Sequence, residues 1–221
     1  MKREVIAELL DEDLGTPEEI ASSLGDLRHI NGWFGGTRTT TALLRQIAQE
    51  TGKSELSLLE IGAGLGDVPL GAQRALAADG IRLQVTLLDR VCSHLPGNGT
   101  PAVSGDAMHL PFCDDSFDVV SSSLFAHHFE PATLPLMAKE SLRVCRNAVL
   151  INDLIRDPLH LGLVYLGLPL FRSRITWHDA PASVRRAYTV SEMKSLLAGV
   201  PARQIEAARY FLFRMGILIW K

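Results

Sequence analysis

A glycine-rich loop between a strand-like run and a helical stretch constrains the fold of this chain more than any other feature. The loop reads Glu60-Ile-Gly62-Ala-Gly64-Leu-Gly66. It follows an apolar run at 57–61 that is typical of a strand buried on both faces of a parallel sheet. An Ala- and Leu-rich helical stretch follows at 67–78. Because glycine lets a ligand approach main-chain N–H groups, the loop predicts a cofactor site in an α/β fold.

Strand-like and helical segments alternate along the rest of the central chain. The pattern predicts strands at 82–88, around Val103, at 117–122 and at 147–153, with helices at 131–143 and 189–199. Such alternation implies βαβ crossovers and a mostly parallel sheet. Two final runs, 202–208 and 211–220, have no helix between them. They predict an antiparallel pair at one sheet edge with a turn near Arg209.

The first 52 residues have a helical pattern and predict an N-terminal helical cap. Val5, Ile6, Leu9 and Leu10 have the spacing of one apolar helix face. Thr16 followed by Pro17 reads as a helix start. A further helix is predicted after Gly35-Gly36, ending at Gly52.

Composition excludes several classes of function. The 22 Lys and Arg residues against 25 Asp and Glu residues give a net charge of −3, which argues against nucleic acid as a partner. The three cysteines lack the spacing of a zinc site and suit a reducing compartment. Residues 1–15 lack the apolar run of a signal peptide, so a cytoplasmic location is expected. The apolar stretches at 159–171 and 211–220 are too short for a transmembrane helix. Contact with a membrane surface and a homodimer both stay open.

The spacing of the glycines argues against the two commonest nucleotide loops. A dinucleotide site requires G-x-G-x-x-G, but counting from Gly62 puts Asp67 at the third position. A carboxylate there repels a pyrophosphate. The Gly-Lys-Ser/Thr of a P-loop is also absent. The pattern E-x-G-x-G-x-G instead suits a cationic or zwitterionic ligand.

Three stretches resemble the class I S-adenosylmethionine-dependent methyltransferases, in particular the methyltransferase type 11 subgroup that contains quinone-biosynthesis enzymes. They are the glycine loop with the strand before it, Leu87-Leu-Asp89, and residues 105–120, which read GDAMHLPFCDDSFDVV. The resemblance implies a three-layer, Rossmann-like, seven-stranded sheet of order 3-2-1-4-5-7-6 over residues 53–221. It also implies S-adenosyl-L-methionine as the cofactor and a substrate-cover insertion at about 156–187.

The resemblance also assigns cofactor-binding residues. Asp89 is expected to bind the ribose hydroxyls and Asp106 the adenine amino group, although either acid would also serve as a helix cap. Arg38 is a candidate partner of the methionine carboxylate, with a solvated arginine as the alternative. The remaining candidates are Glu60, Gly62, Ala63, Gly64, Arg90, Ala107, Met108, Ser122 and Ser123.

Methyl transfer from a sulfonium requires alignment of the acceptor and removal of its proton, and no metal is expected. Histidine is the usual base at neutral pH. His127 and His128 follow the fourth predicted strand, where cofactor and substrate should meet. His178 beside Asp179 is a further candidate. For each of them, a packing or capping role is the alternative.

The predicted cover joins an apolar run at 159–171 to Arg172, Arg174, Arg185 and Arg186. This pattern favours a small hydrophobic acceptor, aromatic or phenolic, methylated at oxygen. Carbon or nitrogen methylation of a quinone-like or other small molecule stays open. An NAD-dependent oxidoreductase and a non-catalytic, cofactor-binding partner protein are the rival functions.

Overall fold

The predicted strands form one seven-stranded sheet in the computed structural model, which describes residues 1–11 and 14–221. The strands are β1 (Glu55–Ile61), β2 (Arg82–Asp89), β3 (Ala102–Ser104), β4 (Phe117–Ser123), β5 (Cys145–Leu154), β6 (Gln204–Tyr210) and β7 (Arg214–Trp220). Their order is β3-β2-β1-β4-β5-β7-β6, and only β7 runs antiparallel to its neighbours. The predicted fold class and strand order are confirmed.

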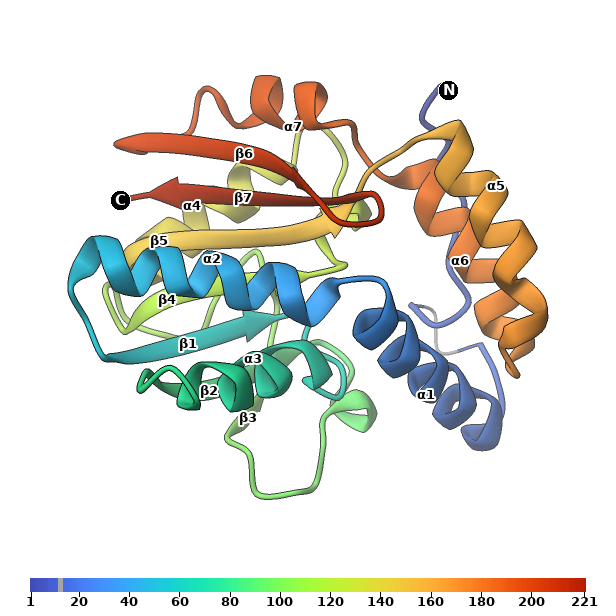
Figure 1. The fold of residues 1–221 in the computed structure, drawn as a ribbon, viewed down its shortest axis with the longest axis horizontal. Helices are drawn as coiled ribbons and strands as arrows, with labels where there is room; N and C mark the ends of the chain where they lie inside the picture. Colours follow the sequence, from blue (N-terminus) through green and yellow to red (C-terminus); the bar gives the residue numbers. More distant parts are fainter. Residues whose placement is uncertain (12–13) are drawn as a thin grey trace.

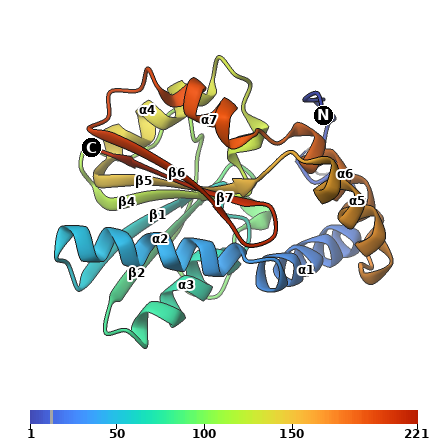
Figure 2. The same ribbon diagram turned by 45° about the horizontal axis from the view of Figure 1, so that its top comes forward.

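Helices cover both faces of the sheet (Figures 1 and 2). They are α1 (Pro17–Trp33), α2 (Gly36–Thr51), α3 (Asp67–Ala77), α4 (Leu134–Val144), α5 (Pro158–Gly167), α6 (Arg174–Arg186) and α7 (Val190–Leu197), with short 3₁₀ turns η1 (Cys92–His94), η2 (Ala126–His128) and η3 (Leu168–Leu170). One face carries α2 and α3 and the other carries α4 and α7. The helices α1, α5 and α6 gather beyond the carboxyl ends of the parallel strands.

The N-terminal region differs from its prediction in two ways. Residues 1–8 form no helix, and positions 12–13 of the predicted cap lie outside the described residues. The backbone N–H groups of Leu9 and Leu10 donate instead to the carboxylate of Asp179 on α6, at 2.9 and 3.0 Å. In addition, α2 packs against α3 and the sheet, so it belongs to a helical layer and not to a cap. The predicted start at Thr16 is confirmed, with a complete capping box to Glu19.

The turn between the last two strands lies further along the chain than expected. It is formed by Phe211 to Phe213, not by the polar residues near Arg209. Leu212 and Phe213 have positive φ angles of 48° and 59°. Ile155 N–H donates to the carbonyl of Phe213 at 2.8 Å. This bond holds an apolar turn against the carboxyl end of β5, which explains why polarity alone misplaced it.

The acid that precedes the glycine loop is buried inside the sheet. Glu60 lies one residue before the end of β1 with 1% of its surface exposed, and its carboxyl accepts a hydrogen bond from the Ser121 hydroxyl of the neighbouring strand β4. Burial disfavours the charged form and raises the pKa of Glu60 to about 7, although hydrogen bonds from serine oppose the shift. Through this hydrogen bond, Glu60 connects β1, the strand before the glycine loop, to β4.

Replacing this acid by its amide should remove a pH dependence of stability. Because the pKa of Glu60 is raised on folding, its contribution is present at pH 5 and is lost as the pH rises through 7. Relative to Glu60→Gln, the wild-type free energy of unfolding should fall by about 1–3 kcal/mol between pH 5 and pH 8. Urea denaturation at both pH values measures this difference. The matched control is Glu55→Gln, which changes an exposed acid on the same strand. An identical pH dependence in wild type and Glu60→Gln would contradict the assignment.

Candidate functional site

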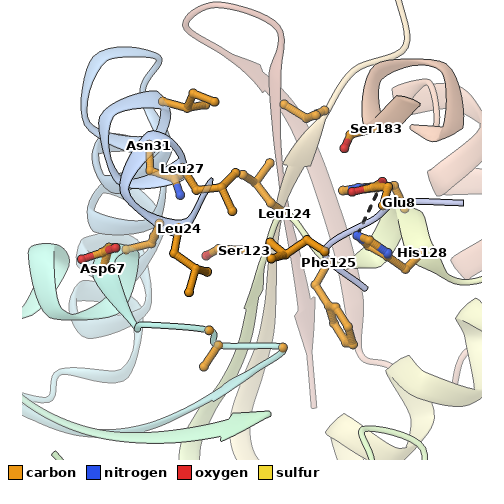
Figure 3. Close-up of a pocket in the computed structure, with 18 of the residues that line it drawn as sticks. Glu8, Leu24, Leu27, Asn31, Asp67, Ser123, Leu124, Phe125, His128 and Ser183 are labelled. Atoms are coloured by element: carbon orange, nitrogen blue, oxygen red, sulfur yellow. Dashed lines mark ion pairs between the residues drawn. The ribbon is translucent and has the colours of Figure 1, made fainter. Parts of the chain in front are cut away.

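A cavity of about 490 Å³ opens at the carboxyl ends of the parallel strands. It lies where the chain crosses from one side of β1 to the other, which is where ligands bind in open α/β sheets. The glycine loop and the end of β2 form one part of its wall. The loop after β4 and residues of α1, α5 and α6 form the rest of the wall, and Figure 3 shows Leu124 and Phe125 of this loop between Leu27 and His128.

The glycines of the loop have the roles expected for a ligand-binding turn. Gly62 has a φ of 62°, and a Cβ at this position would lie 2.4 Å from the ring of Phe125 in the loop after β4. Gly64 has a φ of 50°, and no atom lies within 4 Å of where its Cβ would be. The loop therefore packs against Phe125 on one side and leaves backbone open to the cavity at Gly64.

Two acids follow the neighbouring strands at the same edge. The Oδ2 atom of Asp89 accepts from Gly64 N–H at 2.8 Å, and its Oδ1 atom accepts from Val91 N–H at 3.0 Å. The Oδ1 atom of Asp106 accepts from Met108 N–H at 2.8 Å. Both acids line the cavity. Since each carboxylate oxygen can accept two hydrogen bonds, both acids retain capacity for ligand hydroxyl or amino groups. This donor set fits the ribose and adenine of S-adenosylmethionine.

The structure brings most of the predicted cofactor residues to the cavity. The lining includes Glu60, Gly62, Ala63, Gly64, Asp89, Arg90, Asp106, Ala107 and Ser123. Arg38, Met108 and Ser122 do not line it. Arg38 is exposed on α2, with its guanidinium 6.0 Å from the ring centre of Phe211. Met108 packs against the core, and Ser122 is buried within β4.

His127 and His128 also line the cavity, on the η2 turn after β4. The Nδ1 atom of His127 lies 2.7 Å from Oδ1 of Asp153 at the end of β5, and its backbone N–H donates to Oδ2 of the same acid at 2.8 Å. The Nδ1 atom of His128 lies 2.6 Å from Oδ2 of Asp11. Each imidazole is thus oriented by a carboxylate on one nitrogen.

Glu8 joins these histidines from the N-terminal segment. Its Oε1 atom lies 3.4 Å from Nε2 of His127. The same atom lies 3.9 Å from Nε2 of His128 (Figure 3). Burial opposes the positive charge of His127, but Asp153 and Glu8 outweigh it and raise the pKa of His127 to about 10. Burial also opposes the negative charge of Glu8, yet His127 lowers the pKa of this acid on balance. At neutral pH an imidazolium therefore lies between two carboxylates.

His178 lies outside the cavity lining. It is exposed on α6, with Nδ1 at 2.8 Å from Oδ1 of Asp179. Asp179 holds the backbone of Leu9 and Leu10, so it positions the segment that carries Glu8. Arg3, in the same segment, donates to the carbonyl of His127 at 3.2 Å. The predicted His–Asp pair is thus present, but at a structural junction beside the site.

Sequence reasoning missed a second polar group in the cavity. Arg214, the first residue of β7, lines the cavity and has no exposed surface. Its Nη2 atom donates to Oδ1 of Asn31 at 3.0 Å, whereas Nε and Nη1 have no hydrogen-bond partner in the part of the chain that the structure describes. Burial lowers its pKa to about 10, with Asp153 opposing the shift, so it stays charged at neutral pH. A buried cation with free donors suits an anionic ligand.

Apolar side chains make up the rest of the wall. Leu24, Leu27, Ile30 and Phe34 contribute from the α1 side, Leu163 and Val164 from α5, and Phe125, Phe171, Leu212 and Phe213 from the loops. Leu124 has a φ of 56°, a strained conformation for a residue with a side chain, and lies in the middle of the cavity (Figure 3). Within the described residues, no helix has the length and apolar character needed to cross a membrane.

Comparison with known proteins agrees with the resemblance to methyltransferases found in the sequence. Residues 59–151 match the family model of the methyltransferase domain. No curated protein matches the chain. A solved structure of a putative methyltransferase from an antibiotic biosynthesis pathway of Anabaena variabilis aligns with a TM-score of 0.51 and 22% identity. The alignment covers 76% of this chain and 64% of that protein.

Two further structures contain the cofactor or its product. The plantazolicin methyltransferase BpumL, in complex with a monoazolic desmethylPZN analog and SAH, aligns at a TM-score of 0.70 with 14% identity, over 97% of this chain and 94% of that one. Human N-acetylserotonin methyltransferase, in complex with SAM, aligns at 0.64 with 12% identity, over 98% and 63%. At such identities the likeness shows the fold alone.

The family match covers the loop, both acids and the strands that carry them. The fold around this region has the strand order that the resemblance implied. Residues 59–151 therefore match a methyltransferase domain, and the sheet that contains them has the strand order implied by the resemblance to class I S-adenosylmethionine-dependent methyltransferases.

Proposed function

We propose that this enzyme transfers a methyl group to a hydroxyl oxygen of an apolar, preferably aromatic, acceptor that also carries an anionic group. The observation that carries the proposal is the pairing of two polar features in one apolar cavity. Glu8 and His127 offer groups that bind and deprotonate a hydroxyl, and Arg214 offers free donors to an anion. Residues 156–187 then act as the acceptor cover, since α5 and α6 supply part of the lining.

S-adenosylmethionine supplies a methyl group on a sulfonium, which is an excellent leaving group. The backbone at Gly64, the carboxylate of Asp89 and the carboxylate of Asp106 would hold its ribose and adenine. The protein then has to align the acceptor and exclude water. The apolar side chains of α1 and α5 provide that exclusion.

The acceptor hydroxyl has to lose its proton as its oxygen attacks. A phenol has a pKa of about 10 in water, and a neighbouring positive charge favours its anionic form. The imidazolium of His127 supplies that charge, and the carboxylate of Glu8 is placed to accept the proton. His127 therefore acts by electrostatic stabilisation, while Asp153 fixes its ring.

An amine acceptor is the second candidate. Glu8, Asp11 and Asp153 surround the two histidines, and three carboxylates attract an ammonium group. Methylation products of matched hydroxyl and amino acceptors, located by mass spectrometry, separate the two reactions.

The cofactor assignment predicts saturable binding of S-adenosylhomocysteine. Asp89→Asn should weaken this binding about tenfold or more, because a hydrogen bond to a charged group contributes roughly 1.5–3 kcal/mol. Isothermal titration calorimetry measures the change, with NAD expected to give no signal. Asp79→Asn is the control, since Asp79 is an exposed acid that pairs with Arg45. Binding of NAD in place of S-adenosylhomocysteine would point to the oxidoreductase.

The acceptor assignment predicts a charge-specific effect at Arg214. For hydroxylated aromatic carboxylic acids, Arg214→Gln should raise KM by about 10- to 100-fold through loss of charged hydrogen bonds. For the corresponding methyl esters, KM should change little. Arg209→Gln, at an exposed position of β6, is the control. Thermal denaturation checks that the variants fold. An equal loss for acids and esters would refute an anion-binding role.

A further inference from the structure

Three side chains beside the acceptor cavity form a cluster with the geometry of a metal site. Oε1 of Glu8 lies 3.4 Å from Nε2 of His127 and 3.9 Å from Nε2 of His128, and the possible ligand atoms of the three residues all lie within 4.8 Å of one another. Around a tetrahedral zinc ion with bonds of about 2.0–2.1 Å, neighbouring ligand atoms are about 3.3 Å apart. The Glu8–His127 separation already matches this spacing, and the Glu8–His128 separation exceeds it by about 0.6 Å.

The opposite nitrogen of each ring is already held by a carboxylate. Nδ1 of His127 lies 2.7 Å from Asp153, and Nδ1 of His128 lies 2.6 Å from Asp11. This arrangement fixes both rings with Nε2 toward Glu8. Histidine ligands of metals usually have such a carboxylate or carbonyl on their second nitrogen.

Two buried atoms of the cluster lack a hydrogen bond. Glu8 and His127 have 7% and 2% of their surfaces exposed. Within the described residues, Oε1 of Glu8 and Nε2 of His127 make no hydrogen bond and meet each other only as an ion pair at 3.4 Å. Buried polar atoms are rarely left without a partner, and these two face each other.

The charges around the cluster also favour a cation. The two imidazole rings contact three carboxylates, those of Glu8, Asp11 and Asp153. Arg186 and Arg3 are nearby cations: Nη1 of Arg186 lies 3.7 Å from Asp11, on the outer side of His128, and Arg3 donates to the backbone carbonyl of His127. The inner side, between Glu8 and the two Nε2 atoms, has no such positive side chain among its described contacts.

We propose that Glu8, His127 and His128 bind one divalent transition-metal ion of the zinc class, with a remaining coordination position toward the cavity. Two imidazoles and one carboxylate are a common ligand set for zinc and for ferrous iron. The inference deepens the proposed function and rests on it for the role of the ion. Binding the ion would displace the proton from Nε2 of His127, so the ion, in place of the imidazolium, would favour the anionic form of the acceptor hydroxyl, and the second carboxylate oxygen of Glu8 would accept the proton. It runs against the expectation from the sequence that no metal is required.

The ion would also connect two distant parts of the chain. Glu8 lies in the N-terminal segment, residues 1–11, whereas both histidines lie on η2. Binding would hold this segment against the cavity. Metal binding should therefore protect residues 1–11 from proteolysis.

Zinc titration of the tag-free, chelator-treated protein tests the inference. We expect one Zn²⁺ per chain, with affinity at least tenfold lower in Glu8→Gln and in His128→Gln. Glu4→Gln is the matched control for the acid, since Glu4 lies on the same segment and pairs with Arg185. His29→Gln, on the exposed side of α1, is the control for the imidazole. Both controls should bind Zn²⁺ like the wild type. Co²⁺, followed by its visible absorption, reports the coordination of the bound ion.

S-adenosylhomocysteine titration and methyl transfer are measured on the same samples. Absence of stoichiometric Zn²⁺ binding in protein that still binds S-adenosylhomocysteine would overturn the metal site and leave the methyltransferase assignment intact. Equal Zn²⁺ affinity in all variants would also overturn it, because binding would then lie elsewhere. Site-dependent Zn²⁺ binding without transfer to any hydroxyl acceptor would support the metal site and refute the proposed acceptor chemistry.

Discussion

The carboxylate of Asp153 determines the geometry of the cavity at the end of β5. It accepts the backbone N–H of His127 and binds Nδ1 of the same residue, with 1% of the Asp153 surface exposed. These two bonds fix the η2 turn, and the η2 turn places Phe125 against Gly62. Through these contacts, one buried acid fixes the position of the glycine loop relative to the side of the cavity that carries His127. Its own charge is compensated by His127 and by the more distant Arg214, as a buried carboxylate requires.

The parts of the structure that local patterns specify were predictable. The apolar run before Gly62, the acids Asp89 and Asp106, and the cap at Thr16 each depend on neighbours within a few residues. Parallel strands bring their carboxyl ends to one edge, so the position of the cofactor residues follows from the order of elements. The same reasoning located His127 and His128 at the cavity.

Groups that depend on contacts between distant parts of the chain were not predictable. Glu8 reaches the site because Asp179, 170 residues beyond Leu9, accepts hydrogen bonds from the backbone N–H groups of Leu9 and Leu10, the residues that follow Glu8. The apolar spacing of Val5 to Leu10 suggested a helix, but those residues find partners outside their own segment. Arg214 lies within the run 211–220, for which the sequence predicted only an antiparallel pair at a sheet edge. Its burial follows from the antiparallel pairing of β7 with β5, which inserts it beside Leu154.

The N-terminal segment gives the cavity a wall that is held by hydrogen bonds and ion pairs to other elements, and its residues 1–8 form no helix or strand of their own. Arg3 donates to the carbonyls of His127, Phe129 and Arg186. Leu9 and Leu10 are fixed by one carboxylate, and Glu4 N–H donates to the carbonyl of Arg185. Such a segment opens at a lower free energy than the strands behind it. Under the proposed function, methylated product that leaves on this side of the cavity passes this wall or α5, which also lines the cavity. The rate at which the segment detaches from α6 therefore sets an upper limit on turnover along the first of these routes, independent of the speed of methyl transfer.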